Sequence, residues 1–149
     1  RKLNMLNISG YQEIDKADYL NLKAGKDVEL SSGEIVKNSE LTIAPPKTKS
    51  YAFCSDTSYK PTIIPIIKNA DILYHETTFL ADREDLAIKT KHSTSLQAAQ
   101  IAKDANVKKL IVGHYSGRYK DISLFKKEAE TVFENVDLAV PGKVFNIDS

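Results

Sequence analysis

The sequence has a single cysteine, only three histidines and almost no excess charge. Because Cys54 is alone, an internal disulfide framework is excluded, and its place in an apolar run predicts a core thiol. Lys and Arg total 21 against 20 Asp and Glu, so the net charge of +1 does not indicate a nucleic-acid or membrane partner. Any basic surface must therefore be local. We find no signal peptide, long apolar segment, internal repeat or low-complexity tract, which predicts a cytoplasmic protein without a membrane anchor.

The length and the first residues indicate the number of domains and the origin of the chain. At 149 residues and 42% hydrophobic content, the chain is long enough for one domain with a real core. It begins Arg1-Lys2-Leu3-Asn4, with neither an initiator methionine nor a targeting pattern. We interpret it as a chain cut from a longer protein.

Three short apolar runs end in residues that carry chemistry. Residues 51–54 run into Asp56, residues 72–74 into His75 and Glu76, and residues 110–112 into His114. Each run predicts a buried strand, and the carboxyl ends of such strands meet at one edge of an open α/β sheet. Asp and His are ligands for a borderline metal such as zinc. The residues alone therefore predict half of a metal or acid-base site at this edge.

The elements around these strands predict an α/β layer. Helices are expected at residues 61–69, 93–106 and 121–135, strands at 71–75, 107–112 and 136–140, and a long polar loop with little periodicity at 76–92. Pro65 conflicts with the first helix, because only a first-turn position tolerates its ring. Alternating strands and helices are typical of a sheet with crossover helices on one face. The other face, carrying Phe53, Ile72 and Ile111 or their alternates, is expected to pack against a second sheet that this chain does not contain.

Residues 1–48 give weaker signals. Residues 13–22 are polar and lightly helical. Residues 28–30 and 34–36 flank Ser31-Ser32-Gly33 and predict a small exposed β-hairpin, with Gly33 at a positive φ. Pro45 and Pro46 predict a rigid, extended lead-in to the strand at residue 51.

Four ordered motifs carry a family resemblance. They are Ser55-Asp56-Thr57, His75-Glu76-Thr77-Thr78, His92-Ser93-Thr94 with Gln97-Ala98-Ala99, and Gly113-His114-Tyr115-Ser116 followed by Arg118-Tyr119. In this order they resemble the C-terminal motifs of ribonuclease Z, the tRNA 3′-processing endonuclease of the metallo-β-lactamase superfamily. The resemblance implies an αββα sandwich, of which this chain is the C-terminal half, a mixed sheet with helices on one face. Residues 1–48 would form a variable substrate-side segment and hairpin, and residues 49–149 the α/β layer.

The resemblance assigns a role to each motif. Asp56 is similar to the family's aspartate that bridges two zinc ions, and His114 to its last histidine ligand; a hydroxide between the metals attacks the phosphodiester. His92 is expected to protonate the leaving oxygen or hold the phosphate, and Glu76 to orient His92. Arg118 and Tyr119 are expected to bind the substrate phosphate.

Each of these residues also has a structural interpretation. Asp56 suits a strand-end turn, His114 a hydrogen-bonded core position, His92 a surface loop and Arg118 a surface salt bridge. His75 is expected to be packed or supporting rather than metal-bound. The lysines of the same loops would either add positive charge toward RNA or be merely solvated: Lys89, Lys91 and Lys120.

The sequence also departs from the family pattern. Ser55, Thr77 and Gly117 replace the usual glycine, alanine and serine, and residues 8–25 contain no proline where many members carry a Gly-Pro-rich arm for tRNA. The family's His-x-His-x-Asp-His cluster is absent from this chain, and the two ligands Asp56 and His114 are too few to hold two metal ions.

The activity that the resemblance implies belongs to the full-length protein: a homodimeric, zinc-dependent endoribonuclease that removes the 3′ trailer of precursor tRNA. We expect the fragment alone to be inactive.

Three other readings stay open. A metallo-β-lactamase-fold hydrolase of an arylsulfate or cyclic phosphodiester would share Asp56 and His114, so His92-Ser93-Thr94 and Arg118 discriminate against it. A receiver-like module with Asp56 as phosphate acceptor needs an acidic pair after an earlier strand, which residues 1–30 do not offer. A third alternative is a non-catalytic scaffold that keeps the fold, and metal analysis of the full-length protein would distinguish it from an enzyme.

Overall fold

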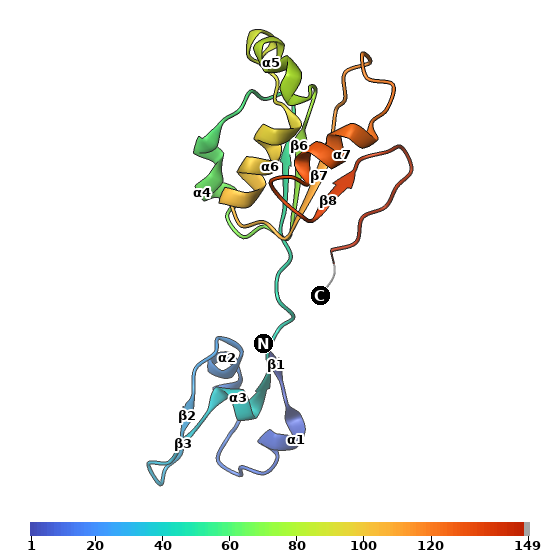
Figure 1. Cartoon of the computed structure of the whole chain (residues 1–149). Coiled ribbons are helices and arrows are strands. Elements are labelled where there is room, and N and C mark those ends of the chain that lie inside the picture. Colours follow the sequence, from blue (N-terminus) through green and yellow to red (C-terminus); the bar gives the residue numbers. More distant parts are fainter. Residues whose placement is uncertain (148–149) are drawn as a thin grey trace. The chain divides into compact units, whose positions relative to one another are not determined.

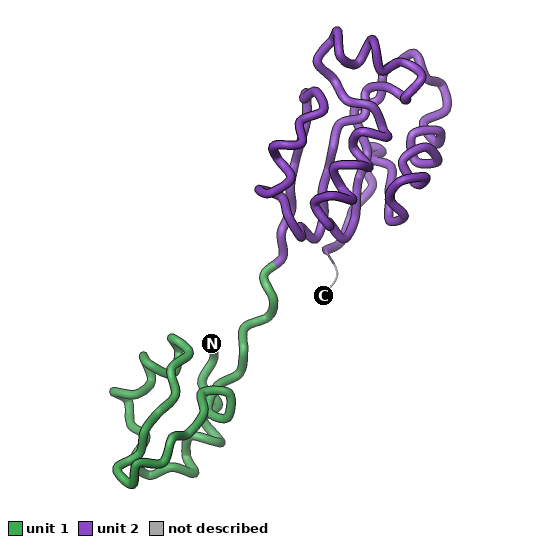
Figure 2. The backbone as a smooth tube through the Cα atoms, turned by 60° about the vertical axis from the view of Figure 1, so that its left-hand side comes forward, with its two compact units in different colours: residues 1–48 green, residues 49–149 purple. Residues whose placement is uncertain are grey.

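The computed structural model describes residues 1–147 and divides the chain into two compact units, Arg1–Thr48 and Lys49–Ser149 (Figure 2). Residues 44–50, which join the units, contain no helix or strand. Pro45 and Pro46 explain this, because proline lacks the N–H that a helix interior or a sheet requires. Among residues 1–147, no helix has both the length and the apolar composition needed to cross a bilayer.

Unit 1 is built from short elements around its own core. Its helices are α1 (Met5–Ile8), α2 (Asp18–Lys23) and α3 (Asn38–Leu41), and its strands pair antiparallel as β1 (Lys2–Leu3) with β4 (Thr42–Ile43) and β2 (Val28–Glu29) with β3 (Ile35–Val36). The β2–β3 hairpin confirms the prediction, and Gly33 has a φ of 84°. The hairpin is not wholly exposed, however, because Val28 and Val36 are buried in a cluster with Leu22 and Leu41.

Unit 2 contains a four-stranded sheet in the order β5-β6-β7-β8 (Figure 1). The strands are β5 (Tyr51–Cys54), β6 (Ile72–Glu76), β7 (Lys109–Gly113) and β8 (Val136–Leu138). All three pairings are parallel, whereas a mixed sheet was expected. The reason is that every connection between consecutive strands passes through a helix, and such crossovers return the chain in the same direction.

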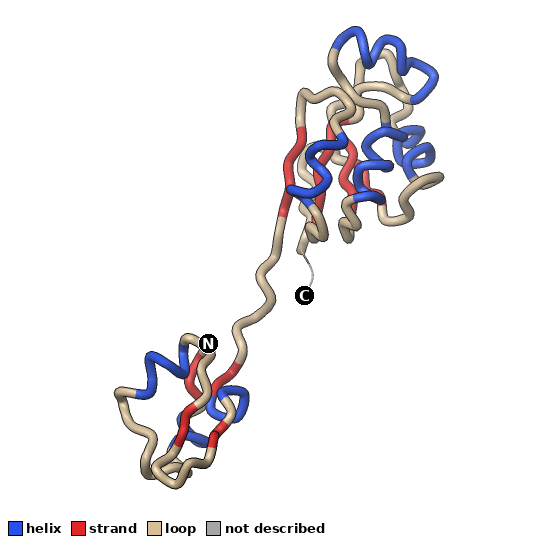
Figure 3. The backbone as a smooth tube through the Cα atoms, turned by 90° about the vertical axis from the view of Figure 1, so that its left-hand side faces the viewer, coloured by secondary structure: helices blue, strands red, loops and turns tan. Residues whose placement is uncertain are grey.

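The helices of unit 2 (Figure 3) are shorter than expected, and one further helical segment lies where a loop was expected. They are η1 (Pro61–Ile63) leading into α4 (Ile64–Ile67), η2 (Ala81–Arg83) leading into α5 (Glu84–Thr90), α6 (Ser95–Asp104) and α7 (Ser123–Ala129). Pro65 lies in the first turn of α4, where its ring is tolerated. The prediction that residues 76–92 are without helix was wrong. Ala87 is the only fully buried residue of α5, so the helix has no apolar stripe for periodicity to detect.

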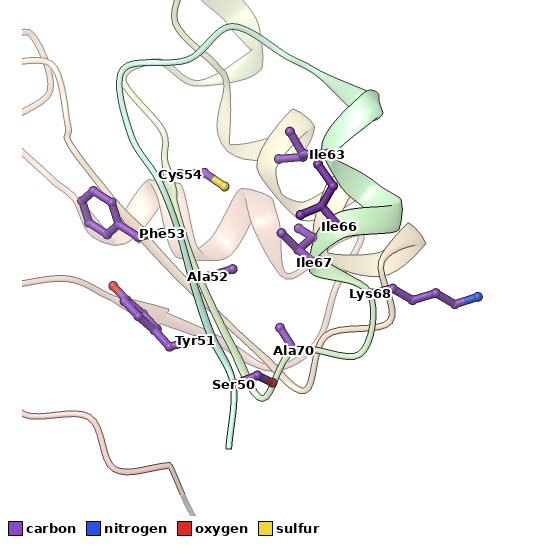
Figure 4. Close-up of a pocket in the computed structure, with 10 residues that line it drawn as sticks. All are labelled: Ser50, Tyr51, Ala52, Phe53, Cys54, Ile63, Ile66, Ile67, Lys68 and Ala70. Atoms are coloured by element: carbon purple, nitrogen blue, oxygen red, sulfur yellow. The ribbon is translucent and has the colours of Figure 1, made fainter. Parts of the chain in front are cut away.

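Alternate residues of the strands face different environments. Leu73, Leu110 and Val112 pack with residues of α6 and α7 in the main core of unit 2. On β5, Ala52 and Cys54 point toward α4 and border a hollow of about 430 Å³, while Tyr51 and Phe53 point the other way (Figure 4). This alternation is the period of a β-strand.

The second face of the sheet is only partly open. Phe53 stacks on Tyr74 with ring centroids 4.7 Å apart, and Tyr51 and Phe53 are exposed. Ile72 and Ile111, which were expected to lie open with Phe53, are only 4% and 3% exposed. The exposed apolar surface is therefore concentrated on the edge strand β5 rather than spread over the central strands.

Candidate metal and acid-base site

Residues from three strand ends and one loop meet at the carboxyl edge of the parallel sheet, the end at which α5 lies (Figure 1). Asp56 comes two residues after β5, Glu76 ends β6 and His114 directly follows β7. His92 comes from the connection between α5 and α6. The ligand atoms of Asp56, His92 and His114 all lie within 4.8 Å of one another. The structure thus brings together the two expected metal ligands, the expected proton donor and its expected partner.

The backbone at the two expected ligands is unusual. Asp56 has a φ of 49° and His114 a φ of 60°, both in the left-handed region that non-glycine residues rarely adopt. Such a conformation costs about 1–3 kcal/mol and is found mostly where the surrounding structure enforces it. Here it turns the chain at the end of each strand and brings His114 Nε2 to 3.4 Å from Asp56 Oδ1.

Glu76 is the buried centre of the site. Its side chain is fully buried, yet it accepts hydrogen bonds from Thr57 N at 3.0 Å, Thr78 N at 3.0 Å, Thr78 Oγ1 at 2.7 Å and His92 Nδ1 at 2.7 Å. A carboxylate is tolerated in such a place only when its oxygens are satisfied in this way. Because backbone N–H groups donate to both of its oxygens, the Glu76 carboxylate acts only as a hydrogen-bond acceptor. His92 Nδ1 therefore carries the proton of the bond to Glu76, and His92 Nε2 is free to contact a metal ion or the substrate.

Thr78 extends this control to His114. Its Oγ1 lies 2.7 Å from Glu76 Oε2 and 2.8 Å from His114 Nδ1. A hydroxyl has one proton, and here that proton goes to the carboxylate, so Thr78 accepts from His114 Nδ1–H. The Nε2 lone pair of His114 is then available on the side of Asp56. One carboxylate thereby fixes the tautomer of both histidines, directly for His92 and through Thr78 for His114.

The loop that carries His92 is held from several sides. His92 N donates to Ala87 O at 2.8 Å, and Ser93 Oγ donates to Thr57 O at 2.7 Å. Thr94 and Gln97 form a reciprocal capping box at the start of α6, inside the range where a helix was expected. His92 thus occupies a fixed place, although its ring is partly exposed.

The other expected site residues lie apart from this group. Tyr119 Oη accepts from Leu80 N at 3.2 Å and is 3.3 Å from Asp82 Oδ1. Arg118 lines a hollow with Asp82, Arg83, Leu86 and Tyr119, and none of the metal-site residues borders it. Their distance from the metal site does not test the expected contact of Arg118 and Tyr119 with the substrate phosphate, so that contact stays a prediction.

His75 is fully buried and does not belong to the group. Its Nδ1 lies 2.7 Å from Glu76 O and must donate to it, because a carbonyl only accepts. Its Nε2 has no hydrogen-bond partner among residues 1–147. Burial lowers the pKa of His75, so the ring stays neutral. This is the packed, supporting position that was expected for it.

The donor set fits an ion of the zinc class. It offers one carboxylate and two imidazoles with Nε2 free, and both donor types are common zinc ligands. Three donors complete at most one four-coordinate shell with a water in the fourth position. A second ion therefore requires ligands beyond the three that residues 1–147 bring together.

Solved structures with a similar fold define the class of protein. The metallo-β-lactamase fold protein YhfI from Bacillus subtilis matches with a TM-score of 0.62 and 33% identity, covering 66% of this chain and 40% of that one. A long form RNase Z from yeast matches with a TM-score of 0.53 and 26% identity, covering 60% of this chain and 12% of that one. No family model matches the sequence. The chain has the metallo-β-lactamase fold, as its motifs predicted.

Sequence relatives are more specific. Ribonuclease Z from Parabacteroides distasonis is 46% identical over 121 residues, which are 81% of this chain and 40% of that protein. Ribonuclease Z from Cytophaga hutchinsonii is 40% identical over 137 residues, which are 91% of this chain and 44% of that protein. The chain is therefore homologous to ribonuclease Z over most of its length, which confirms the resemblance. It spans about two fifths of the length of these relatives.

Proposed function

We propose that the full-length protein containing this chain is a zinc-dependent endoribonuclease that removes the 3′ trailer of precursor tRNA. The observation that carries the proposal is the meeting of Asp56, His92 and His114 around buried Glu76, in a chain 40–46% identical to proteins named ribonuclease Z. A non-catalytic scaffold would have no need to hold two imidazoles with Nε2 free beside a carboxylate. The proposal concerns the full-length protein because the part of the chain that the structure describes brings together too few ligands for two ions.

The residues of this chain divide the work of hydrolysis between them. Two zinc-class ions, when bound, would supply positive charge and the activated water that a phosphodiester requires. Asp56 and His114 Nε2 would hold them from this side of the site. His92, protonated on both nitrogens, would pair its Nδ1–H with Glu76 and give its Nε2 proton to the leaving oxygen. Glu76 therefore acts by orienting and pairing the imidazolium, without touching the substrate.

The partners follow from the same proposal. Precursor tRNA is the substrate, and Arg118 is exposed and offers a guanidinium to a phosphate of the RNA. Tyr119 would support that loop, because its hydroxyl is held between Leu80 N and Asp82. A homodimer in the cytoplasm remains the expected setting.

Asp56→Ala tests the metal part of the proposal. In the full-length protein we expect this variant to lose at least one zinc-class ion, because removing a bridging carboxylate leaves adjacent cations poorly neutralised. Elemental analysis of the purified protein measures this. Asp85→Ala removes an exposed carboxylate of α5 and is the matched control. Unchanged metal content in Asp56→Ala would refute the ligand assignment.

His92→Ala tests the acid part. We expect turnover of 3′-extended tRNA at saturating substrate to fall by about 10²- to 10⁴-fold, the usual contribution of a general acid, with the metal content intact. The metal content also decides between the two roles that the geometry allows for His92. If ions are lost together with activity, His92 is a ligand; normal turnover would make it a loop residue only.

A further inference from the structure

A groove beside His92 has no role in the chemistry described so far. Its volume is about 460 Å³, and it lies between the loop that follows β5 and helix α5. Tyr59 lines it from the loop, Ile88 and Lys91 line it from α5 and its C-terminal end, and His92 itself borders it. His92 is therefore shared by the groove and the metal site. Whatever occupies the groove lies next to the group that His92 would protonate.

The walls of the groove suit a flat, apolar ring. Tyr59 is 39% exposed and Ile88 is 67% exposed, although both are large hydrophobic side chains. Single exposed hydrophobic residues are ordinary on a protein surface, but these two border the same groove from different elements. An aromatic ring and an aliphatic side chain that line one groove offer apolar surface on which a nucleobase can stack.

The polar groups at the groove favour stacking over base-specific reading. Gln97 and Glu84 both border the groove and are engaged with each other, since Gln97 Nε2 donates to Glu84 Oε1 at 2.9 Å, while Gln97 Oε1 accepts from Thr94 N at 3.0 Å. Lys91 is exposed at the end of α5 and carries a positive charge that complements a phosphate. The occupant that matches both features is a nucleotide of a single-stranded RNA segment.

We propose that this groove binds a nucleobase next to the scissile phosphate, stacked on Tyr59 and Ile88, with Lys91 against the neighbouring phosphate. This inference rests on the proposed endoribonuclease function. It adds that the enzyme holds the unpaired strand at the cut by stacking, which every base supports, so that trailers of different sequence are accepted.

A mutant cycle between Tyr59 and the RNA tests the inference. The full-length protein is assayed on 3′-extended tRNA carrying one abasic nucleotide at a time near the cut. With intact RNA, Tyr59→Ala should lower kcat/KM by about 5- to 150-fold, the usual range for one stacked base. With the abasic nucleotide at the subsite position, the same variant should cause little further loss. Tyr59→Phe keeps the ring and should recover most of what Tyr59→Ala loses.

Two controls keep the outcomes separate. Leu124→Ala removes an exposed apolar side chain of α7 away from the groove, and thermal unfolding shows whether each variant is folded. If the losses from Tyr59→Ala and from the abasic nucleotide multiply at every position, no base contacts Tyr59 and the inference is wrong while the nuclease function stands. If the wild-type protein does not cut the RNA at all, the proposed function fails and the subsite fails with it.

Discussion

The hydroxyl of Thr78 is the sharpest place to test how this site is organised. Thr78→Val keeps the shape of the side chain and removes its hydrogen bonds to Glu76 Oε2, at 2.7 Å, and to His114 Nδ1, at 2.8 Å. His114 would then lose the contact that fixes its tautomer, while the bond between His92 and Glu76 stays intact. Losing the partner that orients a metal-binding histidine typically weakens metal affinity by 10- to 100-fold, so we expect about that loss for zinc.

The variant also has a cost in stability that must be separated from its effect on metal. A hydrogen bond to a charged group contributes about 1.5–3 kcal/mol, so the free energy of unfolding should fall by about this amount. Thr77→Val is the matched control. Thr77 is the neighbouring buried threonine, and its Oγ1 donates to the backbone carbonyl of Gly113 at 3.1 Å rather than to Glu76 or to a histidine ring. It should lose stability without losing zinc affinity, whereas Thr78→Ser should retain both.

Two measurements decide the matter. Competition with a chelator gives the zinc Kd of the full-length proteins, and ¹⁵N NMR of the metal-free histidines reports which nitrogen carries the proton. In the wild type His114 should be protonated at Nδ1, and in Thr78→Val it should become a mixture of tautomers. An equal zinc Kd in Thr78→Val and Thr77→Val would refute the link from Glu76 through Thr78 to His114.

Two further predictions concern residues that support the site. Burial lowers the pKa of His75, so the unfolded chain binds a proton at a higher pH than the folded one. The free energy of unfolding should therefore fall as the pH drops below about 6.5, the pKa of histidine in an unfolded chain. Urea unfolding at a series of pH values measures this fall, which should be smaller in His75→Asn than in the wild type. A Cβ at Gly113 would lie 2.6 Å from Tyr74 Oη and 2.7 Å from Tyr74 Cε2, so Gly113→Ala should lower stability by about 1–3 kcal/mol. Gly117→Ala is its control, because nothing lies within 4 Å of a Cβ there; an equal loss in both would contradict the clash.

The sequence was most informative where local chemistry and global fold agree. Apolar runs that end in Asp56, Glu76 and His114 predicted strands and a shared edge, because parallel strands bring their carboxyl ends together. It did not predict α5, in which only Ala87 is buried. Periodicity reports burial on one face, and a helix that buries a single alanine has almost no periodicity to report.

The link through Thr78 was not predicted, and the reason is physical. Residue types and spacing indicate which side chains can bind a metal, but a tautomer depends on which atoms meet after folding. A signal was available in Thr78 itself, two residues after Glu76 in the same motif. Only the two distances to Oγ1 show that its single proton is committed to the carboxylate.

The register of the sheet explains why both ligands depend on the end of β6. Cys54 pairs with His75, and Glu76 pairs with Gly113, so Asp56 and His114 both lie level with the residue after Glu76, on opposite sides of β6. Neighbouring strands are about 4.8 Å apart, so β5 and β7 are separated by about twice that distance. The side chains of Asp56 and His114 must therefore reach across the end of β6 to approach within 3.4 Å. A carboxylate at that end is placed beneath both, which is why Glu76 can orient His92 on one oxygen and, through Thr78, His114 on the other.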